Sequence, residues 1–139
     1  GVSQISTDSR TSPGGYSYER DGDNKDTQFN ISDRRSLDEV IGMLIKKECI
    51  PSFCAACYRK ERTGEDFMRL AKPGTIKGKC NINALITLKE YLDDFASPAV
   101  KEDGYELIKR ISSGLGQRDA RIISRLFKNA DRGVRDEYV

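Results

Sequence analysis

The chain has 139 residues, a length typical of one domain, of which 33% are charged and 37% hydrophobic. Its net charge is only +2, with Lys and Arg mixed among Asp and Glu, so nucleic acid is not expected as a partner. No apolar run approaches the roughly 20 residues of a membrane span, so no membrane contact is expected. The sequence contains no His, which excludes imidazole as a metal ligand or general base within the chain.

Residues 2–6, V-S-Q-I-S, alternate as in a buried strand, and the loop T-D-S-R-T-S-P-G-G-Y follows. A single strand is not stable alone. We therefore expect the chain to be the C-terminal part of a longer protein that supplies the other strands. Small residues let a backbone approach a ligand, and hydroxyls beside an Arg can hold a carboxylate or phosphate. The loop is therefore a candidate ligand site.

Helical periodicity and capping signatures dominate the rest of the chain. They predict helices over 36–47, from Thr63 to about Lys72, from Thr87 onward, from Ser97-Pro98 onward and over 118–130. Gly78 places Cys80 in a loop, and the tail over 131–139 is expected to fray.

A strand, a ligand loop, a long linker and short helices follow one another in this order. This order is typical of a (β/α) barrel that ends in a helical extension. The predicted fold is thus an α/β fragment. Residues 1–50 would hold the last strand and helix of the barrel, and residues 51–139 a mainly α-helical domain.

Cys54 and Cys57 form a C-A-A-C motif, and 22 residues separate Cys57 from Cys80. Two thiolates three residues apart can bind one metal centre, and a third from a later segment can also coordinate it. Three thiolates satisfy three corners of a four-iron cluster and leave one iron open for chemistry. Cys49 lies just beyond an apolar helix face and fits better as a small buried hydrophobe.

Alternative roles for the cysteines stay open. A structural zinc would need all four Cys, but Cys80 has no near partner of its own. A plant-type two-iron cluster matches the spacing Cys49-x4-Cys54-x2-Cys57, but the segment I-P-S-F lacks the small residues of such a loop. A thioredoxin-like redox pair would leave Cys80 without a role. A helical interaction domain with incidental cysteines is a further alternative.

A resemblance to a known family is carried by S-F-C-A-A-C-Y-R-K-E-R-T-G-E-D-F-M-R-L-A-K, by Cys80 and by N-A-L-I-T-L-K-E-Y-L-D-D-F-A-S. These segments resemble the C-terminal domain of the HydG family of FeFe-hydrogenase maturases, which are radical-SAM tyrosine lyases. The segments G-V-S-Q-I-S, S-R-T-S-P-G-G-Y and Q-F-N-I-S-D-R-R-S-L-D-E-V resemble the end of its barrel. The match covers roughly residues 1–112. The tyrosine lyase of thiamine synthesis, which makes 2-iminoacetate, is also similar but lacks this cysteine-bearing domain.

The resemblance implies a lyase that cleaves S-adenosylmethionine at a second 4Fe-4S cluster, outside this chain, and breaks tyrosine into p-cresol and dehydroglycine. The latter would yield carbon monoxide and cyanide at an auxiliary 4Fe-4S cluster, for assembly of the hydrogenase H-cluster. Cys54, Cys57 and Cys80 match the auxiliary-cluster ligands, and the open iron would carry a further iron through a free cysteine.

Ser6, Ser9 and Arg10 match the motif that holds the substrate amino acid or S-adenosylmethionine. Arg10 suits an anionic partner, although a role as a surface cation fits it equally well. The implied partners are tyrosine, the rest of the barrel and other hydrogenase maturation proteins. Unpaired cysteines suggest a reducing compartment, namely the cytoplasm or an organelle of an anaerobic eukaryote.

The sequence departs from the family at several positions. The radical-SAM motif C-x-x-x-C-x-x-C is absent, so this chain is not expected to be active alone. Thr7-Asp8 stands where small residues are expected, and Ile82 stands where Pro is expected in the loop after Cys80. Cys49 is not one of the family's ligands.

Overall fold

The computed structural model describes residues 5–7 and 35–139, which are mainly helical and contain no strand. The chain divides into two units, residues 1–40 and 41–139. The predicted strand over 2–6 lies largely outside the described residues, as do Ser9 and Arg10. The barrel end and the predicted domain boundary at residue 50 therefore remain predictions.

Helix α1, Leu37–Lys46, begins at the capping box predicted from the sequence. The Ser36 backbone N–H donates to Glu39 Oε2 at 2.6 Å, and the Glu39 N–H donates to Ser36 Oγ at 3.2 Å. Two N–H groups that lack partners within the helix are thereby satisfied reciprocally. The predicted helix over 36–47 is confirmed.

The end of α1 explains why Cys49 does not enter the core. Glu48 adopts a left-handed conformation with φ 59°, and the Cys49 N–H bonds back to the Leu44 carbonyl at 2.9 Å. This is a Schellman termination, with Glu48 at the position that glycine usually takes. The chain turns away from the helix face there, and Cys49 is exposed. The prediction of a buried Cys49 is therefore wrong.

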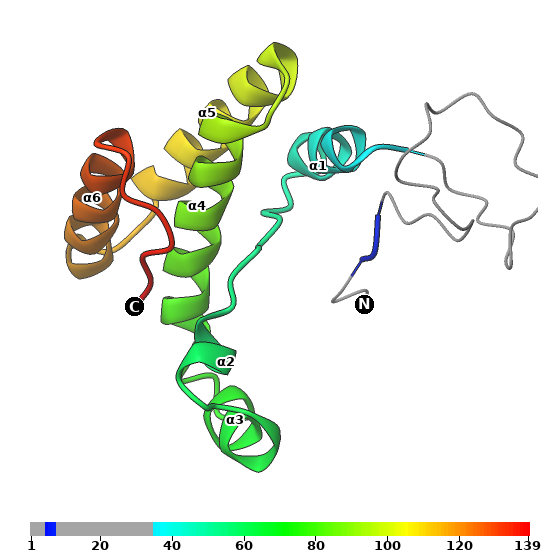
Figure 1. Ribbon diagram of the computed structural model, residues 1–139. Coiled ribbons are helices and arrows are strands. Elements are labelled where there is room, and N and C mark those ends of the chain that lie inside the picture. Colours follow the sequence, from blue (N-terminus) through cyan, green and yellow to red (C-terminus); the bar gives the residue numbers. More distant parts are fainter. Residues whose placement is uncertain (1–4, 8–34) are drawn as a thin grey trace, which may run out of the picture. The chain divides into compact units, whose positions relative to one another are not determined.

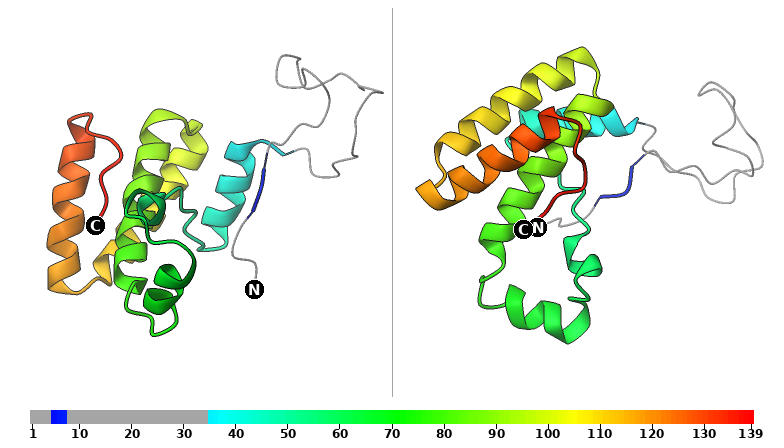
Figure 2. Two further views of the ribbon diagram at one scale, coloured as in Figure 1. Left: turned by 60° about the horizontal axis from the view of Figure 1, so that its bottom comes forward. Right: turned by 60° about the vertical axis from the view of Figure 1, so that its left-hand side comes forward.

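Five further helices follow in chain order: α2 Ala56–Arg59, α3 Gly64–Ala71, α4 Lys77–Asp94, α5 Pro98–Ser113 and α6 Gln117–Asp131. The predicted helices in the regions of α3, α5 and α6 are confirmed. The long helix α4 is central: α5 and α6 pack against it, and α2 and α3 lie near the end where it begins (Figures 1 and 2). In the part of the chain that is described, no helix is long and apolar enough to cross a membrane.

Helix α4 begins earlier than the sequence predicted. Cys80, expected in a loop, lies in its first turn, and Ile82 is a buried residue of the same helix. Thr87, predicted to cap a new helix, lies within it. Its hydroxyl donates to the Asn83 carbonyl four residues earlier, at 2.9 Å. A threonine can satisfy its hydroxyl in this way inside a helix, so the capping signature was misleading.

The core of the second unit is built on α4. Leu85, Leu88 and Leu92 are completely inaccessible to solvent, and Leu107 of α5 and Leu126 of α6 are almost so. Each such side chain contributes about 1.5–3 kcal/mol through removal from water. Gly104 brings α5 close to α4, because a Cβ there would lie 2.5 Å from a Leu92 methyl carbon.

One lysine is buried where the three long helices meet. The Lys89 ammonium lies 2.9 Å from Asp93 Oδ2, 2.7 Å from Asp131 Oδ1 and 3.2 Å from the Tyr105 hydroxyl. Its three N–H donors thus have three partners, and Tyr105 also donates to Asp93. Burial alone would lower the pKa of Lys89, but these hydrogen bonds raise it well above its ordinary value. The lysine is therefore charged and fully paired.

The C-terminal tail, residues 132–139, is ordered along α4 rather than frayed, so that prediction is wrong. Arg135 forms a two-pronged pair with Asp94, at 2.7 and 2.8 Å. Further along, the Asp136 N–H donates to Glu90 Oε1 and the Val139 N–H donates to Asn83 Oδ1, both at 2.9 Å. The tail, drawn red, follows α4 back toward its beginning (Figures 1 and 2).

Candidate metal centre

The segment that carries the C-A-A-C motif is anchored to α4 through Phe53. Its backbone N–H donates to the Thr87 hydroxyl at 3.3 Å, and its ring stacks on Tyr91 with the ring centroids 5.4 Å apart. Both partners lie on α4. The first cysteine, Cys54, follows immediately, so α4 sets the position of the motif.

Cys54 precedes the short helix α2, and Cys57 is its second residue. The Ala56 backbone N–H donates to Cys54 Sγ at 3.4 Å, and Ala56 is itself buried. This contact fixes the position of the Cys54 sulfur at the start of α2. Both cysteines are only half-buried, so their sulfur atoms remain accessible.

Cys80 projects from the first turn of α4 and is exposed. Partial desolvation of its sulfur raises the pKa of the Cys80 thiol, and the nearby Cys57 and Cys54 raise it further. These electrostatic interactions show that the structure brings the three predicted ligands into one neighbourhood. Cys49 makes a different contact: its thiol donates to the Lys47 carbonyl, with 3.6 Å between sulfur and oxygen.

A single ion and a four-iron cluster place different demands on the three cysteines. A zinc ion needs its thiolates within about 4 Å of one another, since each Zn–S bond is about 2.3 Å. Over residues 5–7 and 35–139, no three Cys, His, Asp or Glu residues are grouped closely enough to hold one ion. An iron–sulfur cluster is a larger body held by thiolates alone, and three accessible thiols from two segments fit this requirement.

The tail supplies a second support that the sequence did not reveal. Asp136 Oδ1 lies 3.2 Å from a guanidinium nitrogen of Arg59, at the end of α2. The Tyr138 ring lies beneath the cations of Lys60 and Arg59, 5.0 and 5.8 Å from its centroid. Such contacts contribute about 0.5–1 kcal/mol each at exposed sites. The helix that carries Cys57 is thus held to α4 by the tail as well as by Phe53.

The predicted ligand loop falls mostly outside the described residues. Ser6 is described and exposed, whereas Ser9 and Arg10 lie outside the described residues. Their assignment to a substrate site therefore remains a prediction.

No protein-family model matches the chain, and the search of curated proteins found no match. A similarity is found to the solved crystal structure of HydG, a maturase of the FeFe-hydrogenase. The two share 36% sequence identity with a TM-score of 0.89, over 100% of this chain and 30% of HydG. The chain therefore spans less than a third of that protein's length. The resemblance to HydG inferred from the sequence is thereby confirmed, and the chain is a HydG-like one.

Proposed function

We propose that this chain forms the auxiliary 4Fe-4S site of a radical-SAM tyrosine lyase that serves FeFe-hydrogenase maturation. Cys54, Cys57 and Cys80 are the proposed ligands. The proposal rests on the similarity to HydG over the whole chain, and on the electrostatic proximity of these three thiols.

In this proposal the chain's residues hold and orient the cluster. Cys54 and Cys57 bind from α2 and the segment before it, and Cys80 binds from the first turn of α4. Phe53 and the tail fix α2 against α4. They thereby hold the sulfur atoms of the three cysteines in fixed positions relative to one another. When bound, the cluster would supply one coordination position that no cysteine fills, suited to a further iron and a free cysteine. Cys49 is not among the proposed ligands, and its thiol donates to the Lys47 carbonyl instead.

The complete activity would be shared with other parts of a longer protein. Cleavage of S-adenosylmethionine, and of tyrosine to products that yield carbon monoxide and cyanide, requires a radical-SAM motif that this sequence does not contain. Ser6, Ser9 and Arg10 are proposed to contact the substrate or S-adenosylmethionine in that larger assembly. The cytoplasm, or another reducing compartment, suits the unpaired cysteines.

Metal and sulfide analysis of the anaerobically purified intact protein tests this proposal. We compare wild type with Cys57→Ser, so that any cluster held elsewhere in the protein cancels in the difference. The expected difference is the loss of about four irons and an equal amount of acid-labile sulfide per chain. Loss of one zinc without sulfide would instead establish a structural zinc site, and loss of about two irons a two-iron carrier.

A further inference from the structure

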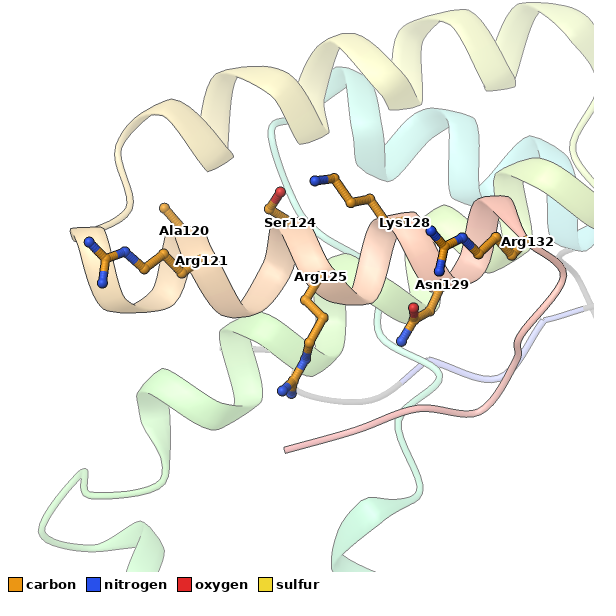
Figure 3. Close-up of a pocket in the computed structure, with 7 residues that line it drawn as sticks. All are labelled: Ala120, Arg121, Ser124, Arg125, Lys128, Asn129 and Arg132. Atoms are coloured by element: carbon orange, nitrogen blue, oxygen red, sulfur yellow. The ribbon is translucent and has the colours of Figure 1, made fainter.

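Helix α6 has a strongly basic face that the proposed cluster site does not use. Arg121, Arg125, Lys128 and Arg132 are all exposed and recur every three or four residues, which places them along one side of the helix (Figure 3). The row spans roughly 16 Å at 1.5 Å per residue. Other positions of the helix are buried in the core: Ile123, Leu126 and Ala130. We call these four cations the α6 basic face.

The α6 basic face borders an open hollow of about 550 Å³. Its remaining lining residues are Ala120, Ser124 and Asn129, so no carboxylate lines it. One carboxylate approaches its margin, because Asn129 donates to Glu137 of the tail at 3.2 Å. Ala120 and Ser124 are small, lie one helical turn apart and border the same hollow.

Lys128, in the last turn of α6, interacts favourably with the helix dipole, but the spacing of the cations along the helix is unfavourable. Arg121 and Arg125 are four residues apart, as are Lys128 and Arg132, and like charges at this spacing destabilise a helix. Within the described residues, none of these four side chains forms an ion pair. The whole chain carries a net charge of only +2, so the remainder of the chain, without these four cations, has a net charge of −2. The α6 basic face is therefore a local concentration of unneutralised charge.

We propose that the α6 basic face is a docking surface for an acidic helix of a partner protein. Residues three or four apart on a helix have Cβ atoms about 5–6 Å from one another, so carboxylates at that spacing follow the same repeat as the four cations. Three of the four are Arg, whose planar guanidinium binds carboxylates with two hydrogen bonds and is enriched at protein interfaces. The small residues Ala120 and Ser124 let a second helix come close.

Two other anionic surfaces fit less well. A helix that lies on an anionic membrane places large apolar side chains beside its basic face. The exposed large apolar residues of the described chain all lie outside α6: Ile5, Phe53, Tyr58, Met68, Phe95 and Val134. Single-stranded nucleic acid is bound by basic grooves that also offer aromatic stacking, and no aromatic residue lines this hollow.

The test uses a fluorescently labelled synthetic helical peptide with Glu at every third or fourth position, titrated with the intact protein at low ionic strength. Binding is followed by fluorescence anisotropy. We expect binding that weakens as salt is added. The double variant Arg125→Glu/Lys128→Glu should weaken it by about tenfold or more, since it replaces two attractions with two repulsions. The double variant Arg125→Ala/Lys128→Ala should weaken peptide binding by a smaller factor. It replaces the charge-reversed variant in the test if charge reversal disturbs folding.

A matched control reverses two exposed cations elsewhere, as Lys47→Glu/Lys109→Glu, with the same change in net charge. This variant should bind the peptide within about twofold of wild type. An equal loss in both double variants, or no binding by wild type, would overturn the proposal. Tighter binding of a short nucleic acid or of phosphatidylserine vesicles than of the peptide, again dependent on Arg125 and Lys128, would also overturn it.

Discussion

Lys89 Nζ lies 2.7 Å from Asp131 Oδ1, and this ion pair joins the middle of α4 to the last residue of α6. The two partners differ in environment, since the Lys89 side chain is 6% exposed and that of Asp131 is 63% exposed. The pair is therefore asymmetric: loss of the lysine would leave the partly buried Asp93 with only Tyr105 and Lys101, whose ammonium is 4.0 Å away, whereas loss of Asp131 removes a group that water can replace.

We expect Lys89→Met to destabilise the packing of α4 with α5 and α6 by about 3 kcal/mol, because the partly buried Asp93 loses its closest cation and keeps only the more distant Lys101. Asp131→Asn is the matched control and should cost less than about 1 kcal/mol. Hydrogen exchange of the α4 amides in the intact protein measures both effects. Equal effects of the two variants would show that burial does not make Lys89 special.

Thr87→Val tests the attachment of the cysteine segment to α4. This change removes the hydroxyl that accepts from the Phe53 N–H. It should lower the free energy needed to detach residues 51–55 from α4 by about 1 kcal/mol, while α4 itself stays intact. Faster hydrogen exchange in that segment is the expected signal. Thr87→Ser keeps the hydroxyl and should exchange like wild type. The Thr87 hydroxyl is not the anchor if Ser and Val behave alike.

Arg135→Ala tests the tail. Without the pair to Asp94, the tail should separate more often from α4 and withdraw Asp136 and Tyr138 from α2. Hydrogen exchange should then rise in both the tail and α2, and the iron content should fall modestly. Arg132→Ala removes a nearby exposed Arg that has no ion pair in the described structure, and should leave α2 unchanged. Protection of α2 that survives Arg135→Ala would contradict a supporting role for the tail.

The stability of the second unit should depend on pH through Asp93. Burial alone would raise the pKa of Asp93, but hydrogen bonds from Tyr105 and Lys89 lower it below its ordinary value. A carboxyl with a lowered folded-state pKa stabilises the fold above its unfolded pKa of about 4. This contribution is lost as the pH falls through the folded-state pKa.

The α5 amides should therefore exchange faster in Asp93→Asn than in wild type at about pH 7. This difference in exchange rate should shrink below about pH 4. Both proteins are compared at the same pH, so intrinsic exchange rates cancel. Glu90, whose pKa is raised by burial, contributes to both proteins and also cancels. A difference that does not change with pH would refute the role assigned to Asp93.

The sequence predicts those features whose cause is local. The capping box at Ser36 and Glu39 and the apolar periodicity of α6 depend on residues a few positions apart, and both were found as predicted. The signature at Thr87 failed because a threonine that bonds to the preceding turn has the same local sequence as one that begins a helix.

Long-range contacts account for the remaining differences. The tail was expected to fray, yet it forms two ion pairs with distant parts of the chain. Arg135 pairs with Asp94, which lies 41 positions earlier, and Asp136 pairs with Arg59, which lies 77 positions earlier. No local pattern signals such pairs. The metal ligands stay a prediction that rests on the spacing and the residue type of the cysteines, whereas the residues that hold α2 in place became apparent only from the fold.

Three cysteines, without Cys49, are proposed to hold one cluster. Paramagnetic resonance of the reduced intact protein, reconstituted anaerobically with iron and sulfide, tests this ligand set when each cysteine in turn is changed to Ser. We predict that the auxiliary-cluster signal is lost in Cys54→Ser, Cys57→Ser and Cys80→Ser and is retained in Cys49→Ser. Loss of the signal in Cys49→Ser, or its survival in any of the other three, would contradict the three-cysteine site.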